Sequence, residues 1–490
     1  MGVILKIVGA VVLYVVTKAV YNLTLHPLAR YPGPKSWIIS RVPYLFSMNS
    51  GRLPYTIKAL HDNYGPIVRV AADELSINDP QAWKDIYNRK DLLRPPQWAN
   101  RPPGVEAHSL ISAPAEDHAR FRKAINPAFN ERATKEYEAV VRKYFDTLLS
   151  HFDSIIDQGN GSGVVDIIDW ANYAFFDIIG EITWSQSYSC LETGTGHASM
   201  GVLLHFQAFL IAATIKYFPW LDALLAAITP KAAFKALEEI FEDSHERLER
   251  RMASTRREHP DVVHYLREQQ AKAGLSEKMS EAEIEQNLLL IIVGGSETLT
   301  SAISGAFHCL LANPEAFSKL VREVRSTFSN EDEITAAATS KLVYLNAVID
   351  ETLRLCPPFP DTLRRYVPAS GAIIAGHAIP ASTTVSVSCY SMFKASAYFS
   401  EPEHFIPERW IDGRDGAKAI EAFKPFAQGP HNCAGQALAR MELRLFLALI
   451  LWKYDIKMIE GERLRKWEEQ KVYWTWEKQP LRVQLSHVKR

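Results

Sequence analysis

The pattern of apolar and polar residues changes character along the chain. Residues 3–21 are almost continuously apolar. Central segments instead repeat apolar residues every three or four positions, which predicts amphipathic helices. Near each end, apolar and polar residues alternate as in strands, over residues 66–78 and again within residues 365–391. The predicted helices cover residues 131–152, 206–226, 231–257 and 281–311. Because alternating strand–helix–strand units are absent, we expect a large helical body with small sheets, and no doubly wound nucleotide-binding fold.

The first apolar segment is long enough to cross a membrane. As a helix, residues 3–21 would be about 28 Å long, close to the ~30 Å hydrocarbon core of a bilayer. A cleavable signal peptide is the alternative, but the sequence YNLTLHPL that follows lacks its small-x-small site. Three basic residues follow the segment, Arg30, Lys35 and Arg41, whereas only Lys6 lies near its N-terminal end. The missing cleavage site predicts a retained anchor over residues 1–25, and the charge bias places the body in the cytosol.

A proline-rich stretch separates the anchor from the body. Residues 26–34 read HPLARYPGP, and proline restricts both its own backbone and that of the preceding residue. We therefore expect residues 26–36 to form a semi-rigid hinge. Asn22 opens a glycosylation sequon, but on the predicted topology it lies on the wrong side of the membrane. Residues 37–490 show no repeat and no second linker, which predicts one domain.

Charge and cysteine usage restrict the function classes. Lys plus Arg total 55 and Asp plus Glu 56, giving a net charge of −1. Proteins that bind nucleic acid usually carry a basic excess, so we expect no nucleic-acid partner. The five cysteines are widely spaced and include no C-x-x-C pair. This spacing argues against a disulfide framework or a zinc site and indicates a reducing compartment.

One cysteine lies in a loop with unusual surroundings. Residues 426–435 read FAQGPHNCAG, and the helical periodicity that follows places Cys433 at the start of a long helix. Helix N-terminal amides favour a thiolate there. Gly429 and Gly435 suit a sharp turn or a close approach to a flat ligand. The loop alone leaves three interpretations open: a buried inert thiol, a nucleophile beside His431, or a metal-binding thiolate.

The long predicted helix over residues 281–311 has a clear N-terminal signal and two unexpected glycines in its middle. Ser280 and Glu283 form a capping-box pattern at its start. Gly294 and Gly295 in its middle each cost about 1 kcal/mol relative to alanine. Packing against another helix would explain one small residue. Close passage over a flat ligand, with a local bulge, would explain both.

Three further motifs complete a family resemblance. Glu351-Thr-Leu-Arg354 is E-x-x-R, Pro407-Glu408-Arg409-Trp410 is P-E-R-W, and Gly294-Gly295-Ser296-Glu297-Thr298 is G-G-x-E-T. With the F-x-x-G-x-x-x-C-x-G loop, these motifs resemble those of the cytochrome P450 superfamily, and they occur in that family's order. The anchor and the Pro-Gly-Pro hinge are similar to its microsomal branch, and the overall style resembles fungal enzymes of secondary metabolism. The resemblance implies a mainly α fold with small β-sheets, the cytochrome P450 fold, preceded by one transmembrane helix.

The resemblance also implies a role for each motif. Cys433 would be the thiolate ligand of the iron of haem b, within a loop that includes Phe426, Gly429, His431 and Gly435. Thr298 and Glu297 would relay protons for breaking the O–O bond, as a hydroxyl beside a carboxylate can. Glu351, Arg354 and Arg409 would form a structural clamp that holds the loop, although an exposed surface pair is the alternative. The remaining haem contacts implied are Gly294 and Gly295, with His118, Arg122 and Arg365 at the propionates.

One position departs from the family pattern. The loop usually carries arginine two residues before the cysteine, and His431 stands there. A largely neutral imidazole cannot fork as a guanidinium does. We therefore expect weaker propionate binding at this point, with Arg122 and Arg365 carrying more of it.

The implied reaction inserts one atom of O₂ into an apolar organic substrate such as a terpenoid, polyketide or alkaloid. Electrons would come from NADPH through a separate cytochrome P450 reductase, with cytochrome b5 as a further donor, at the endoplasmic reticulum membrane. Desaturation, ring formation or oxidative coupling is the alternative reaction, and a haem-free anchored protein is the more distant one. By family position, substrate contacts are expected within residues 95–115 and 206–220 and near residues 360–362.

Overall fold

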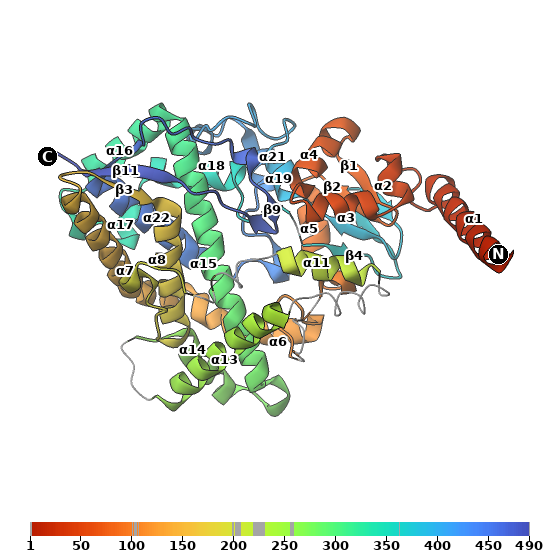
Figure 1. Ribbon diagram of the computed structural model, residues 1–490, viewed down its shortest axis with the longest axis horizontal. Helices are drawn as coiled ribbons and strands as arrows, with labels where there is room; N and C mark the ends of the chain where they lie inside the picture. Colours follow the sequence, from red (N-terminus) through yellow and green to blue (C-terminus); the bar gives the residue numbers. More distant parts are fainter. Residues whose placement is uncertain are drawn as a thin grey trace.

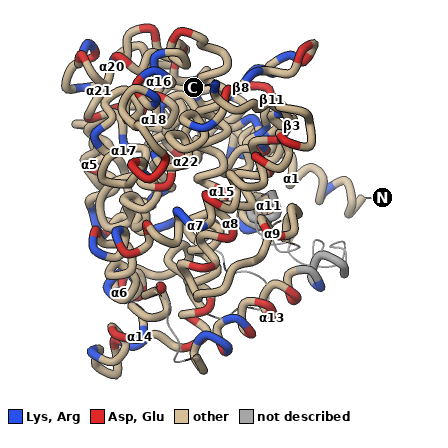
Figure 2. The backbone as a smooth tube through the Cα atoms, turned by 90° about the vertical axis from the view of Figure 1, so that its left-hand side faces the viewer, with Lys and Arg blue, Asp and Glu red and all other residues tan. Residues whose placement is uncertain are grey.

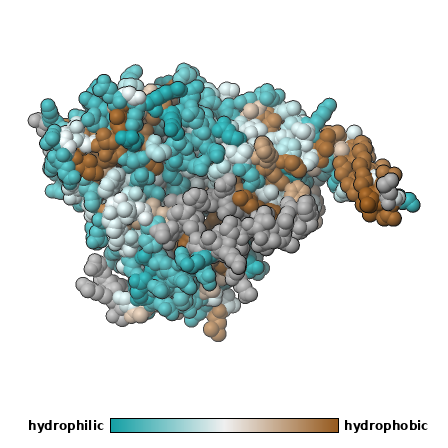
Figure 3. All heavy atoms as spheres, in the orientation of Figure 1, coloured by the Kyte–Doolittle hydropathy of each residue, from teal (hydrophilic) through white to brown (hydrophobic). Residues whose placement is uncertain are grey.

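A computed structural model describes residues 2–99, 101, 105, 107–197, 200, 207–218, 231–254, 259–361 and 363–489. It shows a wide helical body from which one helix projects (Figure 1). That helix, α1 (Gly2–Thr24), is exposed and apolar, with a mean hydropathy of 2.2 in its most apolar window. Figure 3 shows it as an almost continuous apolar surface beside a largely polar body. In Figure 2, acidic and basic residues are interspersed over one side of that body, as a near-zero net charge requires.

The long helices form the part of the body farther from α1. They include two of the predicted helices at slightly different lengths, and a third, α15, with the predicted capping box between Ser280 and Glu283. Of the predicted helix over residues 206–226, α11 is observed, and residues 206 and 219–226 lie outside the described part. These helices are α7 (Glu131–Gln158), α8 (Ile167–Trp184), α13 (Lys231–Ala253), α14 (Val262–Lys272), α15 (Glu281–Ala312), α16 (Pro314–Thr327), α18 (Val343–Leu355) and α22 (Gln436–Lys453). The shorter α11 (Gln207–Lys216) instead packs against α3 (Val42–Asn49).

Shorter helices connect the sheets and loops around this bundle. They are α2 (Lys35–Ile39), α3 (Val42–Asn49), α4 (Leu53–Tyr64), α5 (Gln81–Tyr87), α6 (Ala115–Ile125), α9 (Cys190–Thr193), α17 (Ala336–Thr339), α19 (Cys389–Phe393), α20 (Arg409–Asp412) and α21 (Gly416–Ala422).

The predicted strand at residues 66–78 is a hairpin of two strands. It joins two later strands in a four-stranded sheet of order β1-β2-β7-β4, in which β2 and β7 are parallel. The members are β1 (Ile67–Ala71), β2 (Glu74–Ile77), β4 (Arg365–Tyr366) and β7 (Thr384–Ser386).

The remaining strands are short, and several were not predicted. The strand over residues 163–166 pairs with the C-terminal strand, which is central in its sheet, so segments more than 300 residues apart lie side by side. These strands are β3 (Gly163–Asp166), β8 (Tyr454–Met458) and β11 (Arg482–His487) in one sheet, with the pairs β5 (Ala372–Ile374) and β6 (His377–Ile379), and β9 (Val472–Tyr473) and β10 (Thr475–Trp476).

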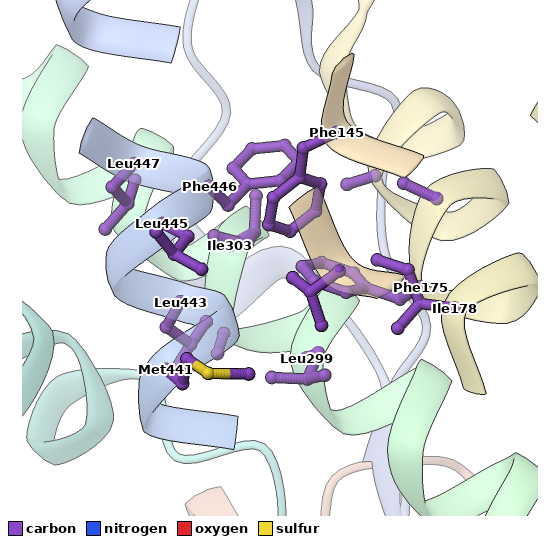
Figure 4. Packing of buried hydrophobic residues seen from close by; sticks show 14 of the residues in the cluster. Phe145, Phe175, Ile178, Leu299, Ile303, Met441, Leu443, Leu445, Phe446 and Leu447 are labelled. Carbon is purple, nitrogen blue, oxygen red and sulfur yellow. The ribbon is translucent and has the colours of Figure 1, made fainter. Parts of the chain in front are cut away.

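The main core forms where four long helices meet. Apolar side chains of α7, α8, α15 and α22 interdigitate around Phe145, Phe175 and Phe446, whose rings lie 5.5–6.0 Å apart between centroids (Figure 4). All three aromatic side chains are buried. This packing fixes the middle of α15 and the start of α22 relative to each other, and those two segments carry the motifs of interest.

The proline-rich stretch, for which a semi-rigid hinge was expected, is packed onto the body. Leu28 is fully buried. A Cβ at Gly33 would lie 2.1 Å from the Arg69 carbonyl oxygen. Asn22, at the end of α1, is also buried, and its carbonyl oxygen accepts a hydrogen bond from Arg69 Nη1 at 2.8 Å. The end of the apolar helix is therefore attached directly to the β1–β2 sheet.

Candidate active site

The loop before α22 presents the thiol of Cys433. The Cys433 amide donates to the Phe426 carbonyl oxygen at 2.9 Å, which closes the loop. Gly429 has a φ of +78°, and a Cβ there would lie 2.1 Å from the carbonyl oxygen of Tyr87, so no other residue fits without displacing backbone. The Cys433 residue is exposed, in contrast to Cys190, Cys309 and Cys356. The loop thus holds one accessible thiol in a constrained backbone.

The ionisation of Cys433 differs from the sequence-based expectation. Although the residue is exposed, the protein atoms around its sulfur raise the pKa of the thiol by desolvation, and the Gly435 amide and the charge of Arg122 lower it by less. The helix N-terminus therefore does not by itself produce a thiolate here, because desolvation disfavours the charged form more strongly. A bound cation would be needed to hold this sulfur deprotonated.

Four cationic or imidazole side chains gather beside this loop. Burial, and then the charges of Arg94, Arg122 and Arg365, lower the pKa of His118 to about 4. Burial and Arg365 lower the pKa of the neighbouring His431 to about 2. Burial followed by the charge of Arg365 lowers the pKa of Arg94 to about 9. The group is thus a concentration of positive charge that disfavours its own protonation.

This group has unused hydrogen-bonding capacity. Four of the buried nitrogen atoms that lack a hydrogen-bond partner within the described part of the chain belong to this group: Arg94 Nε and Nη1, Arg365 Nη2 and His431 Nδ1. Buried donors are normally satisfied, so their convergence indicates an anionic ligand. Two carboxylates of a haem fit this group in charge and chemistry.

Arg122, an expected propionate contact, and Arg94, which was not predicted, both lie near the cysteine loop. Arg122 donates from Nη1 to the Asn432 carbonyl oxygen at 3.1 Å and from Nη2 to Asn432 Oδ1 at 2.8 Å. It therefore braces the loop beside Cys433. Arg94 was not among the expected contacts, because no motif distinguishes it in the sequence. Its role becomes visible only where the chain before η1 (Pro96–Trp98) meets β4 through the Leu93–Tyr366 bridge.

The E-x-x-R and P-E-R-W motifs come together in a buried ion-paired group. Arg354 donates from Nε and Nη2 to the two oxygens of Glu351 at 2.9 and 2.8 Å. Arg409 Nε donates to Glu351 Oε1 at 3.1 Å, and Trp410 Nε1 donates to Oε2 at 2.9 Å. All three charged side chains are buried, which excludes the alternative of an exposed pair.

This clamp is connected to the cysteine loop through aromatic packing. The Trp410 ring lies 4.5 Å from the ring of Phe423, between centroids. Phe423 directly precedes the segment that forms the loop. Arg354 Nη1 also donates to the carbonyl oxygens of Phe393 and Pro402, at 2.9 and 2.6 Å. The clamp therefore ties together the segments on which the loop rests.

The two glycines in the middle of α15 have different environments. A Cβ at Gly295 would lie 2.6 Å from Ile179 of α8, so helix packing accounts for this residue. At Gly294 a Cβ would meet nothing within 4 Å. Thr298 Oγ1 donates to the Gly294 carbonyl oxygen at 2.7 Å, and the helix is continuous here without the expected bulge. Only Gly294 keeps the expected open approach.

Glu297 has a charged partner besides its neighbour Thr298. Its carboxylate is buried and forms a short ion pair with Lys478, which follows β10 near the C-terminus. No feature of the sequence connected these two residues. The Glu297 carboxylate, the acid of the predicted relay, is thus held by a cation from the C-terminal segment.

Comparisons with known proteins show the family of the chain. The family model of cytochrome P450 matches residues 32–485. The chain is 34% identical to the cytochrome P450 monooxygenase lcsI of Purpureocillium lilacinum, over 98% of this chain and 93% of that protein. It is 35% identical to averantin hydroxylase of Dothistroma septosporum, over 98% and 90% respectively. It is 33% identical to trichothecene C-15 hydroxylase of Fusarium sporotrichioides, over 97% and 96%.

Proposed function

This chain belongs to the cytochrome P450 family, and on that premise we propose that Cys433 is the thiolate ligand of the iron of haem b. Membership makes the chain a haem-thiolate monooxygenase that incorporates oxygen into an organic substrate and takes electrons from a redox partner. The observation that carries the assignment to Cys433 is its accessible thiol beside a cluster of buried, unsatisfied cations. Cys190, Cys309 and Cys356, by contrast, are buried.

Arg94, Arg365, His118 and His431 would hold the haem propionates. The support is electrostatic: binding two carboxylates would satisfy the orphan donors and remove the repulsion among the cations. Arg122 would act one step away, by holding Asn432 and placing its charge near the Cys433 sulfur. The clamp of Glu351, Arg354 and Arg409 would keep the loop backbone in place while the cofactor binds.

When bound, the haem supplies reductive activation of O₂, from which one oxygen atom enters the substrate and the other leaves as water. The chain would supply protons on the side of α15. The Thr298 hydroxyl can donate a proton once it releases the Gly294 carbonyl oxygen, and the adjacent Glu297 carboxyl can replace that proton. Gly294 leaves space next to this hydroxyl.

The substrate would meet an aromatic wall. Trp98 stacks on Trp474, with ring centroids 6.1 Å apart, and Phe359 lies edge-on to Trp474 at 6.2 Å. Trp98 Nε1 donates to Tyr217 Oη at 3.1 Å, so two of the segments expected to contact substrate meet here. Trp474 has a φ of +73°, a strained conformation of the kind that binding sites often retain. Apolar, ring-containing secondary metabolites, such as a terpenoid, polyketide or alkaloid, suit these surfaces.

The body would lie on the cytosolic face of the endoplasmic reticulum membrane, attached by α1 over residues 1–25. Leu25, Val42 and Phe46 are exposed next to α1 and would extend the apolar contact into the lipid. The redox partner would be NADPH–cytochrome P450 reductase, with cytochrome b5 as a second donor. Residues 26–36 would serve as a docked connection to the catalytic domain of residues 37–490.

A reduced, CO-bound absorption spectrum tests the assignment of Cys433. The wild-type protein should show the strongly red-shifted band of a thiolate-ligated haem, and Cys433→Ser should lose it. Cys389→Ser, at a partly buried cysteine elsewhere, should keep it. A red-shifted band in Cys433→Ser would refute the assignment. Incorporation of ¹⁸O from ¹⁸O₂ into the product would then separate oxygen insertion from desaturation or coupling.

A further inference from the structure

A cavity of about 530 Å³ lies beside the C-terminal half of α15, away from the cysteine loop. Its inner wall includes Ser304 and His308 of α15, together with Trp467, Gln470 and Gln479 of the C-terminal segment. Its rim carries Glu462, Arg463, Arg465 and Lys466, which are all exposed. The cavity therefore opens to solvent and has a mixed lining, in which polar groups stand beside apolar residues such as Met458 and Leu481. The proposed function makes no use of it.

The cavity lies on the same helix face as the buried acid. Glu297, Ser301, Ser304 and His308 are spaced by four, three and four residues, which aligns them along one side of α15. Neighbours at this spacing have Cβ atoms about 5–6 Å apart. Seven residues of helix, from Glu297 to Ser304, span only about 10 Å. A row of polar groups thus leads from the solvent-open cavity to the buried carboxylate.

Buried polar atoms without hydrogen-bond partners lie in the middle of this row and beside it. Ser301 is completely buried, and among the described residues its Oγ has no hydrogen-bond partner. Trp467 Nε1, in the cavity wall, is buried and equally unsatisfied within that part of the chain. Buried polar atoms of this kind are usually satisfied by ordered water. By contrast, the adjacent Thr300 faces α8, and its Oγ1 contacts Asn172 Oδ1 at 3.3 Å.

The C-terminal segment joins the two ends of the row. Lys478 forms the ion pair with Glu297, and the next residue, Gln479, lines the cavity. Gln479 is itself fixed by two hydrogen bonds. Its backbone N–H donates to Gln470 Oε1 at 3.2 Å, and its side-chain Oε1 accepts from Arg465 Nη1 at 2.7 Å. The position of Lys478 is therefore set by the cavity wall.

We propose that the protons consumed in the reaction enter through this cavity and pass along the Ser304–Ser301 face of α15 to Glu297, with Lys478 as a positioning residue that holds the Glu297 carboxylate. This proposal rests on the proposed function, because it supplies the relay through Thr298. Each proton that leaves Glu297 toward Thr298 leaves a carboxylate behind. A proton from solvent restores the acid, passing through water and through the Ser301 hydroxyl, which accepts one proton as it releases another. The chain is unchanged after each transfer.

The first test measures access to the row in the ferric holoenzyme, without turnover. Ser304→Cys, Ser301→Cys and the matched control Thr300→Cys are treated with a small neutral thiol reagent, and labelling is followed by mass spectrometry. Cysteines at 304 and 301 should react about tenfold or more faster than cysteine at 300, since thiol reactivity follows access. If cysteine at 301 is as unreactive as cysteine at 300, the row is closed to solvent and the proposal is wrong.

The second test measures proton supply in holoenzyme reconstituted with reductase and NADPH. Ser301→Ala and Lys478→Met should increase the fraction of consumed O₂ released as hydrogen peroxide by about threefold or more, with a larger solvent deuterium isotope effect. Lys478→Arg should restore both values, and Thr300→Val should leave them unchanged. Unchanged peroxide and isotope effects in Ser301→Ala would overturn the proposal. All variants should keep the red-shifted CO band, and its absence from the wild type would refute the proposed function instead.

Discussion

The imidazole rings of His118 and His431 lie against each other, with centroids 3.8 Å apart and planes 39° from parallel. His118 comes from α6 and His431 from the loop two residues before Cys433. Stacking of two neutral rings explains how this loop accommodates histidine where the family usually has arginine. Both rings stay neutral because burial and the nearby arginines oppose protonation.

His431→Arg should slow the loss of haem. A guanidinium would offer charged, forked donors to a carboxylate, and one such hydrogen bond is worth about 1.5–3 kcal/mol, or roughly tenfold or more in dissociation rate. The rate can be measured by haem transfer to a haem-free globin. His431→Gln, which lacks the charge, should show no slowing. Equal rates for arginine and histidine would mean that this position does not face the propionates.

Arg94→Met should have opposite effects on the two forms of the protein. Haem dissociation should accelerate by about tenfold or more, because a charged donor to the propionates is lost. The haem-free protein should become more stable in urea, because a buried cation repelled by Arg365 is removed. Arg132→Met, at a side chain that is 84% exposed, is the control and should change neither value. A destabilised haem-free Arg94→Met protein would contradict this account of the cluster.

Glu351→Gln should severely destabilise the protein. The substitution leaves Arg354 and Arg409 buried without their shared carboxylate, and breaking such a group costs about 3–5 kcal/mol. The free energy of unfolding in urea and the yield of holoprotein should both fall. Glu315→Gln removes an exposed pair with Lys319 and should cost less than about 1 kcal/mol. Similar losses in the two variants would show that the clamp has no special role.

His61 should make the fold sensitive to acid. Burial lowers the pKa of this side chain to about 4, while its Nε2 lies 2.8 Å from Ser76 Oγ. The unfolded chain binds a proton below about pH 6.5, whereas the folded chain does not until about pH 4, so stability falls as the pH decreases through this window. Between pH 7 and pH 5 the wild type should lose about 2 kcal/mol more than His61→Gln in urea unfolding.

His404→Gln is the control for this pH dependence, because His404 is exposed. It should follow the wild-type profile. If His61→Gln follows the wild type as well, protonation of His61 does not contribute to acid unfolding.

Phe46→Glu should weaken membrane binding in a chain that lacks residues 1–25. Phe46 is 75% exposed, and burying a side chain of this size in lipid contributes about 1.5–3 kcal/mol, or roughly tenfold or more in partitioning. Sedimentation with phosphatidylcholine vesicles measures the effect. Leu275→Glu alters an exposed leucine that follows α14, a helix that lies well apart from α1 in Figure 1, and should leave binding unchanged. Equal binding of the Phe46→Glu and parent chains would exclude this contact.

The sequence alone determined the features whose physics is local. The anchor helix, the capping box at Ser280 and the start of α22 after Cys433 follow from periodicity and from groups a few residues apart. The pairing of Glu351 with Arg354 is equally local, because three residues of helix bring them together. The family resemblance, and not local physics, assigned Arg409 to the clamp and identified the cofactor as haem.

Only the tertiary structure decided the features that join distant segments. Arg94 enters the cation cluster, and Lys478 reaches Glu297, because the fold places their segments beside β4 and α15. Strand β3 exists because the C-terminal strand pairs with it. The ionisation of Cys433 was also a tertiary matter: a helix N-terminus is visible in the sequence, whereas the desolvation that outweighs it depends on how densely the rest of the chain packs around the sulfur.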